Sequence, residues 1–290
     1  MRTFCSFLML LFASVTIAQT NSEVFIVNIN FTPTGMLTSD LTNISNDSGY
    51  DNQPSFASDN HVLFAGNNKG QTDFYQYQIK ENKKTLLGGL NSGGEYSPQV
   101  IPGQEGIAAV RLDTTGLQRL YRYDLDANTS STLIDDLVVA YYTFYDANTI
   151  VGCYIEDENL NLFVFKKDEN KSYTLLKDVG RSFYKVPNQD SVSYTVQNEE
   201  GNQDIYLLDM KTYESFFVTQ LPIGVQDYAW LDESRIVIGS RNSLFIYDTF
   251  GDTGWEKMAQ LTAPGLDMIS RIAVSPNGKT IALAASGKSK

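Results

Sequence analysis

The segment Leu120-Tyr121-Arg122-Tyr123-Asp124 alternates aromatic residues and ends in an aspartate, and related segments recur along the chain. There are six such apolar and aromatic segments: Val24-Phe25-Ile26-Val27, Phe74-Tyr75-Gln76-Tyr77, Leu120-Tyr121-Arg122-Tyr123, Leu162-Phe163-Val164-Phe165, Ile205-Tyr206-Leu207-Leu208 and Leu244-Phe245-Ile246-Tyr247. Their first residues lie 50, 46, 42, 43 and 39 positions apart. Aromatic and β-branched residues favour strands. A strand-based period of about 40–45 residues indicates a β-propeller, with one blade per repeat.

The flanks of these segments predict four strands in each repeat. In the first repeat, Gln53-Pro54-Ser55-Phe56 and His61-Val62-Leu63-Phe64-Ala65 precede the aromatic strand, and Thr85-Leu86-Leu87 follows it. Polar turns rich in Asn, Asp and Gly separate the strands, as expected for hairpins. The second and third strands are continuously apolar, which indicates that both faces of each sheet are buried between neighbouring blades.

Each end of the chain supplies half a repeat. Residues 269–285 predict a first and a second strand, and residues 23–44 predict a third and a fourth. Pairing the two halves closes the ring and removes open sheet edges. The predicted fold is therefore all-β: a six-bladed β-propeller of four-stranded antiparallel blades, closed by the N- and C-terminal strands. The predicted blades span residues 50–87, 95–134, 140–177, 181–218, 226–261, and 269–285 combined with 23–44.

Residues 1–18 have the pattern of a cleaved signal peptide. Arg2 gives a positive start, Phe4–Phe12 is apolar, and Thr16-Ile17-Ala18 places small residues before the cleavage point. The apolar run is shorter than the roughly 20 residues that span a bilayer. We therefore expect a single propeller domain, residues 19–290, that is exported to the periplasm or the exterior and has no membrane span after signal removal.

The cysteine count bears on disulfide formation, and the net charge bears on the class of partner. Cys5 would leave with the signal peptide, so Cys153 would be the one remaining cysteine and no internal disulfide could form. The formal net charge is −12 at pH 7. An acidic surface disfavours nucleic acid as a partner because the phosphate backbone is itself negative.

The repeat resembles the PD40 (WD40-like) repeat of the TolB family of propellers. The first half of that motif resembles Gln53-Pro54-Ser55-Phe56, Ser97-Pro98-Gln99-Val100 and Ser275-Pro276-Asn277-Gly278. The second half resembles Leu120-Tyr121-Arg122-Tyr123-Asp124, Ile205-Tyr206-Leu207-Leu208-Asp209 and Leu244-Phe245-Ile246-Tyr247-Asp248. The resemblance covers nearly the whole chain after the signal, without the α/β domain that precedes the TolB propeller. It implies a fold and leaves the activity open.

Histidine and cysteine chemistry has little support in this sequence. His61 is the one histidine, and it opens a predicted second strand, where neighbouring blades pack. Hydrolysis by a Ser-His-Asp triad needs a histidine to carry the proton, and a tetrahedral zinc site needs several nitrogen or sulfur ligands. We therefore predict no catalytic residues and no cofactor, with calcium as the one metal to consider.

One segment follows the spacing of a calcium-binding loop. Oxygen ligands fall at positions 1, 3, 5, 7 and 12 of the loop pattern, while position 6, where a glycine is usual, is Thr129. The same place in every repeat is a polar hairpin, so an ordinary turn is the alternative. The five candidate ligands are Asp124, Asp126, Asn128, Ser130 and Asp135.

The beginnings of the first strands supply the candidate binding residues. In a propeller these positions surround the central channel, where a mixture of acidic, basic and aromatic side chains could recognise a small polar ligand or a peptide. The alternative is a solvated funnel with no specific ligand. The predicted channel-mouth residues are Asp51, Asn52, Glu95, Tyr96, Tyr141, Arg181, Asp227 and Arg271.

The leading hypothesis from sequence is a non-catalytic propeller that binds a protein, a peptide or a glycan. Rigid rings present loops from several blades on one face, so they can build a recognition surface without catalytic groups. The alternatives are a calcium-dependent lactonase-like hydrolase or a lyase acting at the central channel, and a structural component of an envelope assembly.

Overall fold

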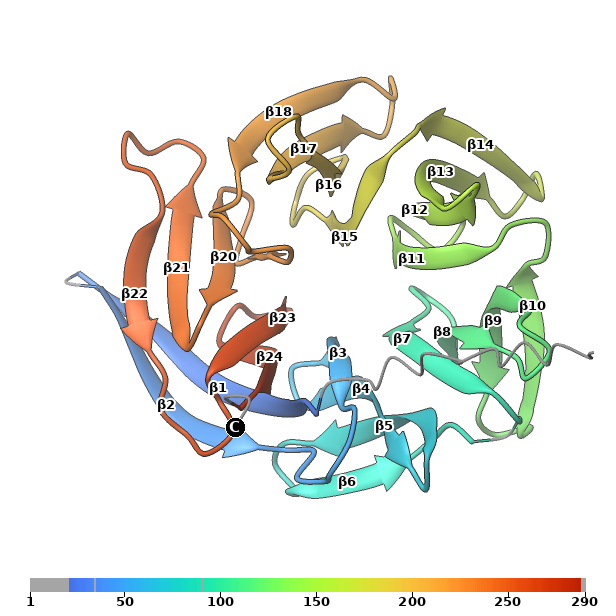
Figure 1. The fold of residues 1–290 in the computed structure, drawn as a ribbon, viewed down its shortest axis with the longest axis horizontal. Coiled ribbons are helices and arrows are strands. Elements are labelled where there is room, and N and C mark those ends of the chain that lie inside the picture. The colour runs from blue at the N-terminus through green and yellow to red at the C-terminus, as the bar shows by residue number, and fades with distance from the viewer. Residues whose placement is uncertain (1–20, 34, 90, 288–290) are drawn as a thin grey trace, which may run out of the picture.

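The computed structural model describes residues 21–33, 35–89 and 91–287, and the predicted signal peptide, residues 1–18, lies outside them. These residues form 24 strands in six four-stranded antiparallel sheets, arranged around a central axis (Figure 1). The fold is the six-bladed β-propeller that the repeats predicted. None of the described residues forms a helix that is long and apolar enough to cross a membrane.

Five blades are each built from four consecutive strands, which run in order from the axis outward. The first blade contains β3 (Asn52–Ser58), β4 (His61–Asn68), β5 (Gln71–Gln78) and β6 (Lys83–Leu86). The second contains β7 (Gly94–Val100), β8 (Ile107–Leu112), β9 (Gln118–Asp124) and β10 (Thr129–Ile134). The third contains β11 (Val139–Phe144), β12 (Thr149–Glu156), β13 (Asn159–Lys166) and β14 (Lys171–Leu176).

The remaining blades complete the ring. The fourth blade contains β15 (Val179–Lys185), β16 (Ser191–Gln197), β17 (Gln203–Asp209) and β18 (Ser215–Gln220). The fifth contains β19 (Ala229–Trp230), β20 (Arg235–Ser240), β21 (Ser243–Asp248) and β22 (Glu256–Gln260). The closing blade contains β23 (Met268–Val274), β24 (Thr280–Ser286), β1 (Glu23–Thr32) and β2 (Gly35–Asn43).

The closing blade joins the two ends of the chain. Its strand order is β2-β1-β24-β23, and β1 pairs with β24 so that Val24 lies opposite Ala284 and Ile26 opposite Ala282. The ring is thus closed by backbone hydrogen bonds between segments that most of the sequence separates, as the two half-repeats predicted.

The core lies between the blades. The described residues contain six buried apolar clusters, each contributed mainly by two neighbouring blades. Phe74 of the first blade meets Tyr123 of the second with ring centroids 5.0 Å apart, and both are fully buried. Phe163 of the third blade packs with Leu120 of the second. The recurring aromatic residues therefore hold adjacent blades together and position the inner strands around the axis.

Candidate binding site

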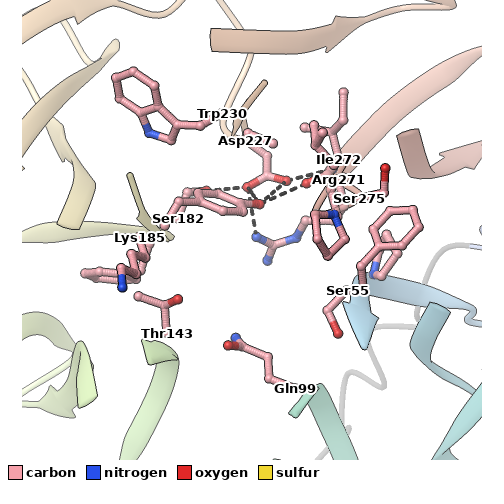
Figure 2. A pocket seen from close by; sticks show the side chains of 18 of the residues that line it. Ser55, Gln99, Thr143, Ser182, Lys185, Asp227, Trp230, Arg271, Ile272 and Ser275 are labelled. Carbon is pink, nitrogen blue, oxygen red and sulfur yellow. Dashed lines mark hydrogen bonds and ion pairs between the residues drawn. The ribbon is translucent and has the colours of Figure 1, made fainter. Parts of the chain in front are cut away.

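A cavity of about 460 Å³ lies where the inner strands converge, and Figure 2 shows side chains from around the ring pointing into it. Every blade contributes to its wall. One lining residue from each blade, in chain order, is Ser55, Gln99, Thr143, Lys185, Asp232 and Ser275. The volume is within the range of small-ligand pockets. Because the wall comes from six blades, no single repeat could form this site.

The two ends of the cavity differ in exposure. One end is lined by residues near the beginnings of the inner strands, and we call it the inner end. Its residues Tyr141, Arg181 and Arg271 are half-buried. Lys185 and Asn188 lie at and beyond the end of β15 and are exposed, and we call their part of the cavity the loop end. Solvent therefore reaches the cavity at its loop end.

Side chains from several inner strands hydrogen-bond the backbone of the next blade, one repeat further along the chain. The Gln53 side chain accepts from the Ser97 N–H (2.8 Å), and Gln99 Nε2 donates to the Tyr142 carbonyl (2.8 Å). The Ser182 hydroxyl lies within hydrogen-bond distance of both the Gln226 carbonyl (2.9 Å) and Asp227 Oδ1 (2.6 Å), between which its one proton is shared. Each inner strand is the edge of its sheet, so these contacts satisfy backbone groups that would otherwise lack partners. The cavity wall is consequently held in place from blade to blade.

Both carboxylates that line the cavity are paired with arginines. Asp227 accepts hydrogen bonds from the Ser182 hydroxyl (2.6 Å) and the Ile272 N–H (2.9 Å), and lies 3.6 Å from Arg271 Nη1. Asp232 lies 2.6 Å from Arg235 Nη2 at the loop end. A carboxylate that is engaged in this way is a poor acceptor for a substrate proton and a poor ligand for a metal ion.

Two cations of the cavity have no carboxylate partner among the described residues. These are Arg181 at the inner end and Lys185 at the loop end, whereas Arg271 is paired with Asp227. Burial, and then the nearby Arg271, lower the pKa of Arg181, while the Asp227 carboxylate acts in the opposite direction. The cavity is therefore a locally positive region in a chain of net charge −12.

Tyrosines surround the two arginines of the inner end. The rings of Tyr50 and Tyr96 meet edge to face, 6.4 Å apart, and the Arg271 guanidinium lies 5.3 Å from the centre of the Tyr141 ring. Burial raises the pKa of Tyr50 to about 12, with the nearby Arg271 acting in the opposite direction. The Tyr50 hydroxyl therefore stays neutral and protonated at physiological pH.

The structure divides the predicted channel-mouth residues into two groups. Those that line the cavity are Tyr141, Arg181, Asp227 and Arg271. Those outside its lining are Asp51, Asn52, Glu95 and Tyr96. The first group comes from the third, fourth, fifth and closing blades, so the charged groups gather on one side of the axis.

Asp51, Asn52 and Glu95 support the propeller from within. Asp51 accepts from the Asn67 N–H (3.1 Å), and Asn52 Nδ2 donates to the Ser22 hydroxyl (3.3 Å). Glu95 is fully buried and accepts from the Gly89 N–H (3.1 Å). Burial raises the pKa of Asp51 to about 6 and that of Glu95 to about 7. Their place beside the start of a strand is what the sequence predicted, but their side chains turn into the protein.

Sequence reasoning missed the cavity residues that lie further along each inner strand. Gln53, Gln99, Ser182 and Lys185 follow the strand beginnings that were singled out, and they line the cavity toward its loop end. A basic residue four positions after Arg181, in an acidic chain, was the one signal that could have identified Lys185.

The calcium-loop candidate is the hairpin between β9 and β10. Asp124 Oδ1 accepts from the Ala127 N–H (2.9 Å), which stabilises the turn, and Arg111 Nη1 donates to the Ser130 hydroxyl (3.1 Å). A guanidinium at one proposed ligand opposes a divalent cation there. Across residues 21–33, 35–89 and 91–287, no group of three or more His, Cys, Asp or Glu side chains is placed to hold a metal ion.

Comparison with known proteins shows similarity in structure. No family model and no curated protein matches this sequence. TolB from Acinetobacter baumannii aligns with a TM-score of 0.57 and 11% identity, over 92% of this chain and 65% of that one. A TolB-type structure from Agrobacterium tumefaciens aligns with a TM-score of 0.66 and 13% identity, over 93% of this chain and 99% of that one.

Enzymes share the same architecture. The oligogalacturonate lyase from Vibrio parahaemolyticus aligns with a TM-score of 0.53 and 11% identity, over 92% of this chain and 98% of that one. Identities this low establish the fold and leave the activity open. The protein therefore has the fold of the TolB-type six-bladed β-propellers, as its repeat motifs predicted.

Proposed function

We propose that this protein is an exported, non-catalytic binding propeller that holds a protein, peptide or glycan partner in its central cavity. The observation that carries the proposal is the cavity itself. Residues from all six blades line it, hydrogen bonds between blades fix its wall, and two of its cations form no salt bridge within the part of the chain that the structure describes. A preorganised concave site of this kind favours binding because little conformational entropy is lost when a ligand enters.

Binding fits the cavity better than the enzymatic alternatives. A calcium-dependent hydrolase or lyase would need carboxylates directed at a cation near the axis, but Asp227 and Asp232 are each engaged by an arginine. Arg181 would repel such a cation from the inner end. A purely structural role in an envelope assembly would require no cavity with unpaired charges.

The proposed location is the periplasm or the exterior of the cell. It rests on the signal-peptide pattern of residues 1–18 and on the repeat motifs that resemble TolB. The acidic surface, with a net charge of −12, suits a soluble protein and disfavours anionic partners everywhere except at the cavity.

The test is to fill the cavity. Thr143 lines the cavity, so a larger side chain at this position would occupy part of the cavity volume. Thr143→Trp should therefore exclude a ligand. The matched control is Thr132→Trp on the exposed outer strand β10. Molecules that the wild-type protein retains from an envelope extract are identified by mass spectrometry and titrated one by one in a calorimeter.

We expect at least one ligand that binds the wild type and Thr132→Trp with equal affinity and binds Thr143→Trp at least tenfold more weakly. Equal binding to all three proteins by every ligand would place recognition outside the cavity and contradict the proposal.

A further inference from the structure

Arg181 is the cation of the inner end that needs a counter-ion. Its Nε atom is buried and has no hydrogen-bond partner among the described residues, and its guanidinium forms no salt bridge there, although the Asp227 carboxylate attracts it from a distance. The neighbouring Arg271 repels it, and burial removes part of its hydration. A planar carboxylate would relieve both effects, because guanidinium and carboxylate form two parallel hydrogen bonds.

Lys185 supplies a second positive charge on the same strand. It lies four residues after Arg181 at the end of β15, where it is exposed at the loop end of the cavity. Its ammonium lies 5.0 Å from the centre of the Tyr145 ring, and it forms no salt bridge among the described residues, although it interacts electrostatically with Asp190. Four residues of extended strand span roughly 13 Å. The two positive side chains thus lie on one inner strand, four residues apart, and the pairing of that strand with β16 is irregular between Val179 and Phe183.

The spacing and the exposure suit an extended peptide that enters from the loop end. A peptide carries a single carboxylate at its terminus, which matches the single unpaired guanidinium of the inner end. An extended chain also advances about 3.3 Å per residue, so a side chain four residues before the terminus reaches the level of Lys185.

The aromatic residues of the wall suit a sugar less well. Saccharide rings stack on flat, accessible aromatic faces, but Trp230, Tyr142 and Phe183 are buried, and the Trp230 indole donates to the Ser193 hydroxyl (2.8 Å). Arg271 lies over the Tyr141 ring. The positive sites of the cavity are therefore better placed for a peptide than its rings are for a glycan.

We infer that the cavity binds the carboxyl-terminal end of an extended peptide, with the terminal carboxylate on Arg181 and an acidic side chain about four residues earlier on Lys185. This inference rests on the proposed function, since it specifies the ligand of the same cavity.

The probe is a library of hexapeptides that are labelled with a fluorophore at the amino end. One position, four residues before the last, is fixed as glutamate, and the others are random. Companion libraries carry an amidated carboxyl terminus, or glutamine at the fixed position. Oligomers of a hexuronic acid serve as the acidic-glycan arm. Fluorescence polarisation measures binding to the wild type, Thr143→Trp, Arg181→Gln and Lys185→Gln, and circular dichroism checks that each variant is folded.

The matched controls remove one positive charge outside the cavity. Arg119→Gln on β9 corresponds to Arg181→Gln, and Lys257→Gln on β22 corresponds to Lys185→Gln. Both controls should bind the free-acid library as the wild type does. Amidation or Arg181→Gln should weaken binding roughly tenfold to a hundredfold, as expected for loss of a charged hydrogen-bond pair. Glutamine in the peptide or Lys185→Gln should each weaken it about two- to fivefold, and the two together should add nothing further.

The outcomes separate the inference from the proposed function. If Thr143→Trp abolishes peptide binding while amidation and Arg181→Gln have no effect, the carboxylate inference is wrong and the cavity remains a binding site. If the uronic acid oligomers bind in the cavity and the peptides do not, the ligand is an acidic glycan and the peptide inference is overturned. If neither class binds and the envelope extract yields no cavity ligand, both proposals fail.

Discussion

At the scale of single residues, Glu95 shows how this propeller places ionisable groups in its core. The carboxyl group has no exposed surface, and burial raises its pKa from 4.5 to about 7. The Tyr123 hydroxyl and the buried Asp73 lie near it, and the positive charge of Arg111 acts in the opposite direction, lowering the pKa of Glu95. The folded protein therefore retains a proton on Glu95 at pH values where the unfolded chain has released it.

The pH dependence of stability should reflect this proton. Because the folded pKa is raised, the stabilisation is complete below about pH 4.5 and is lost as the pH rises toward 7. At pH 8 the ionised group costs on the order of 3 kcal/mol of unfolding free energy. Glu95→Gln should accordingly be more stable than the wild type at pH 8 and equal to it near pH 4.5, as measured by urea unfolding.

The control for this substitution is Glu105→Gln, which changes an exposed carboxylate in the loop between strands β7 and β8 of the same blade. It should leave the unfolding free energy within about 0.5 kcal/mol of the wild type at both pH values. A Glu95→Gln variant that is less stable than the wild type at pH 8 would show that the ionised carboxylate is well accommodated in the core.

At the scale of elements, the third strand of each blade carries much of the packing between blades. Phe163 on β13 has no exposed surface and lies in the cluster between the second and third blades. Phe217 on the outer strand β18 is 58% exposed. The two positions compare the same residue type in a third and a fourth strand.

Phe163→Ala should lower the unfolding free energy by about 3–5 kcal/mol, because it removes a buried ring and leaves a cavity. Phe217→Ala should change it by less than about 1 kcal/mol, since much of that side chain already contacts water. Chemical denaturation followed by circular dichroism measures both. Similar losses at the two positions would mean that the outer strands pack as tightly as the third strands.

At the scale of the whole molecule, the ring depends on pairing between its ends. β1 lies between β24 and β2, and its Phe25 packs with Leu244 of the fifth blade. Losing β1 and β2 would leave β24 as an open edge and uncover apolar residues on both sides. Each buried aliphatic or aromatic side chain contributes about 1.5–3 kcal/mol, so several such losses approach the total stability of a domain.

Deletion of residues 1–44 should therefore abolish the single cooperative unfolding transition at 25 °C. The protein that lacks only residues 1–18 is the control and should unfold in one step. Urea unfolding followed by tryptophan fluorescence distinguishes the two. A truncated protein that unfolds cooperatively, with stability within about 1 kcal/mol of the control, would show that the ring does not need its closing strands.

Sequence alone determined the architecture, because each propeller repeat is encoded by residues that are close together in the chain. The aromatic period gave the number of blades, and the half-repeats at the two ends gave the closure that β1 and β24 make. Each blade needs only its own strands and turns to be recognised, so the pattern can be read without knowing the spatial neighbours.

Only the tertiary structure decided which charged residues face the cavity and which of them are paired. Asp51 and Glu95 lie near the beginnings of inner strands as Arg181 does, but their side chains turn into the protein. Side-chain direction depends on the register of each strand, and a shift of one residue reverses it. Arg271 is paired with Asp227, a residue of the neighbouring blade, whereas Arg181 has no such partner among the described residues. Partnerships across blades arise only when the ring closes, and they are what makes this cavity positive.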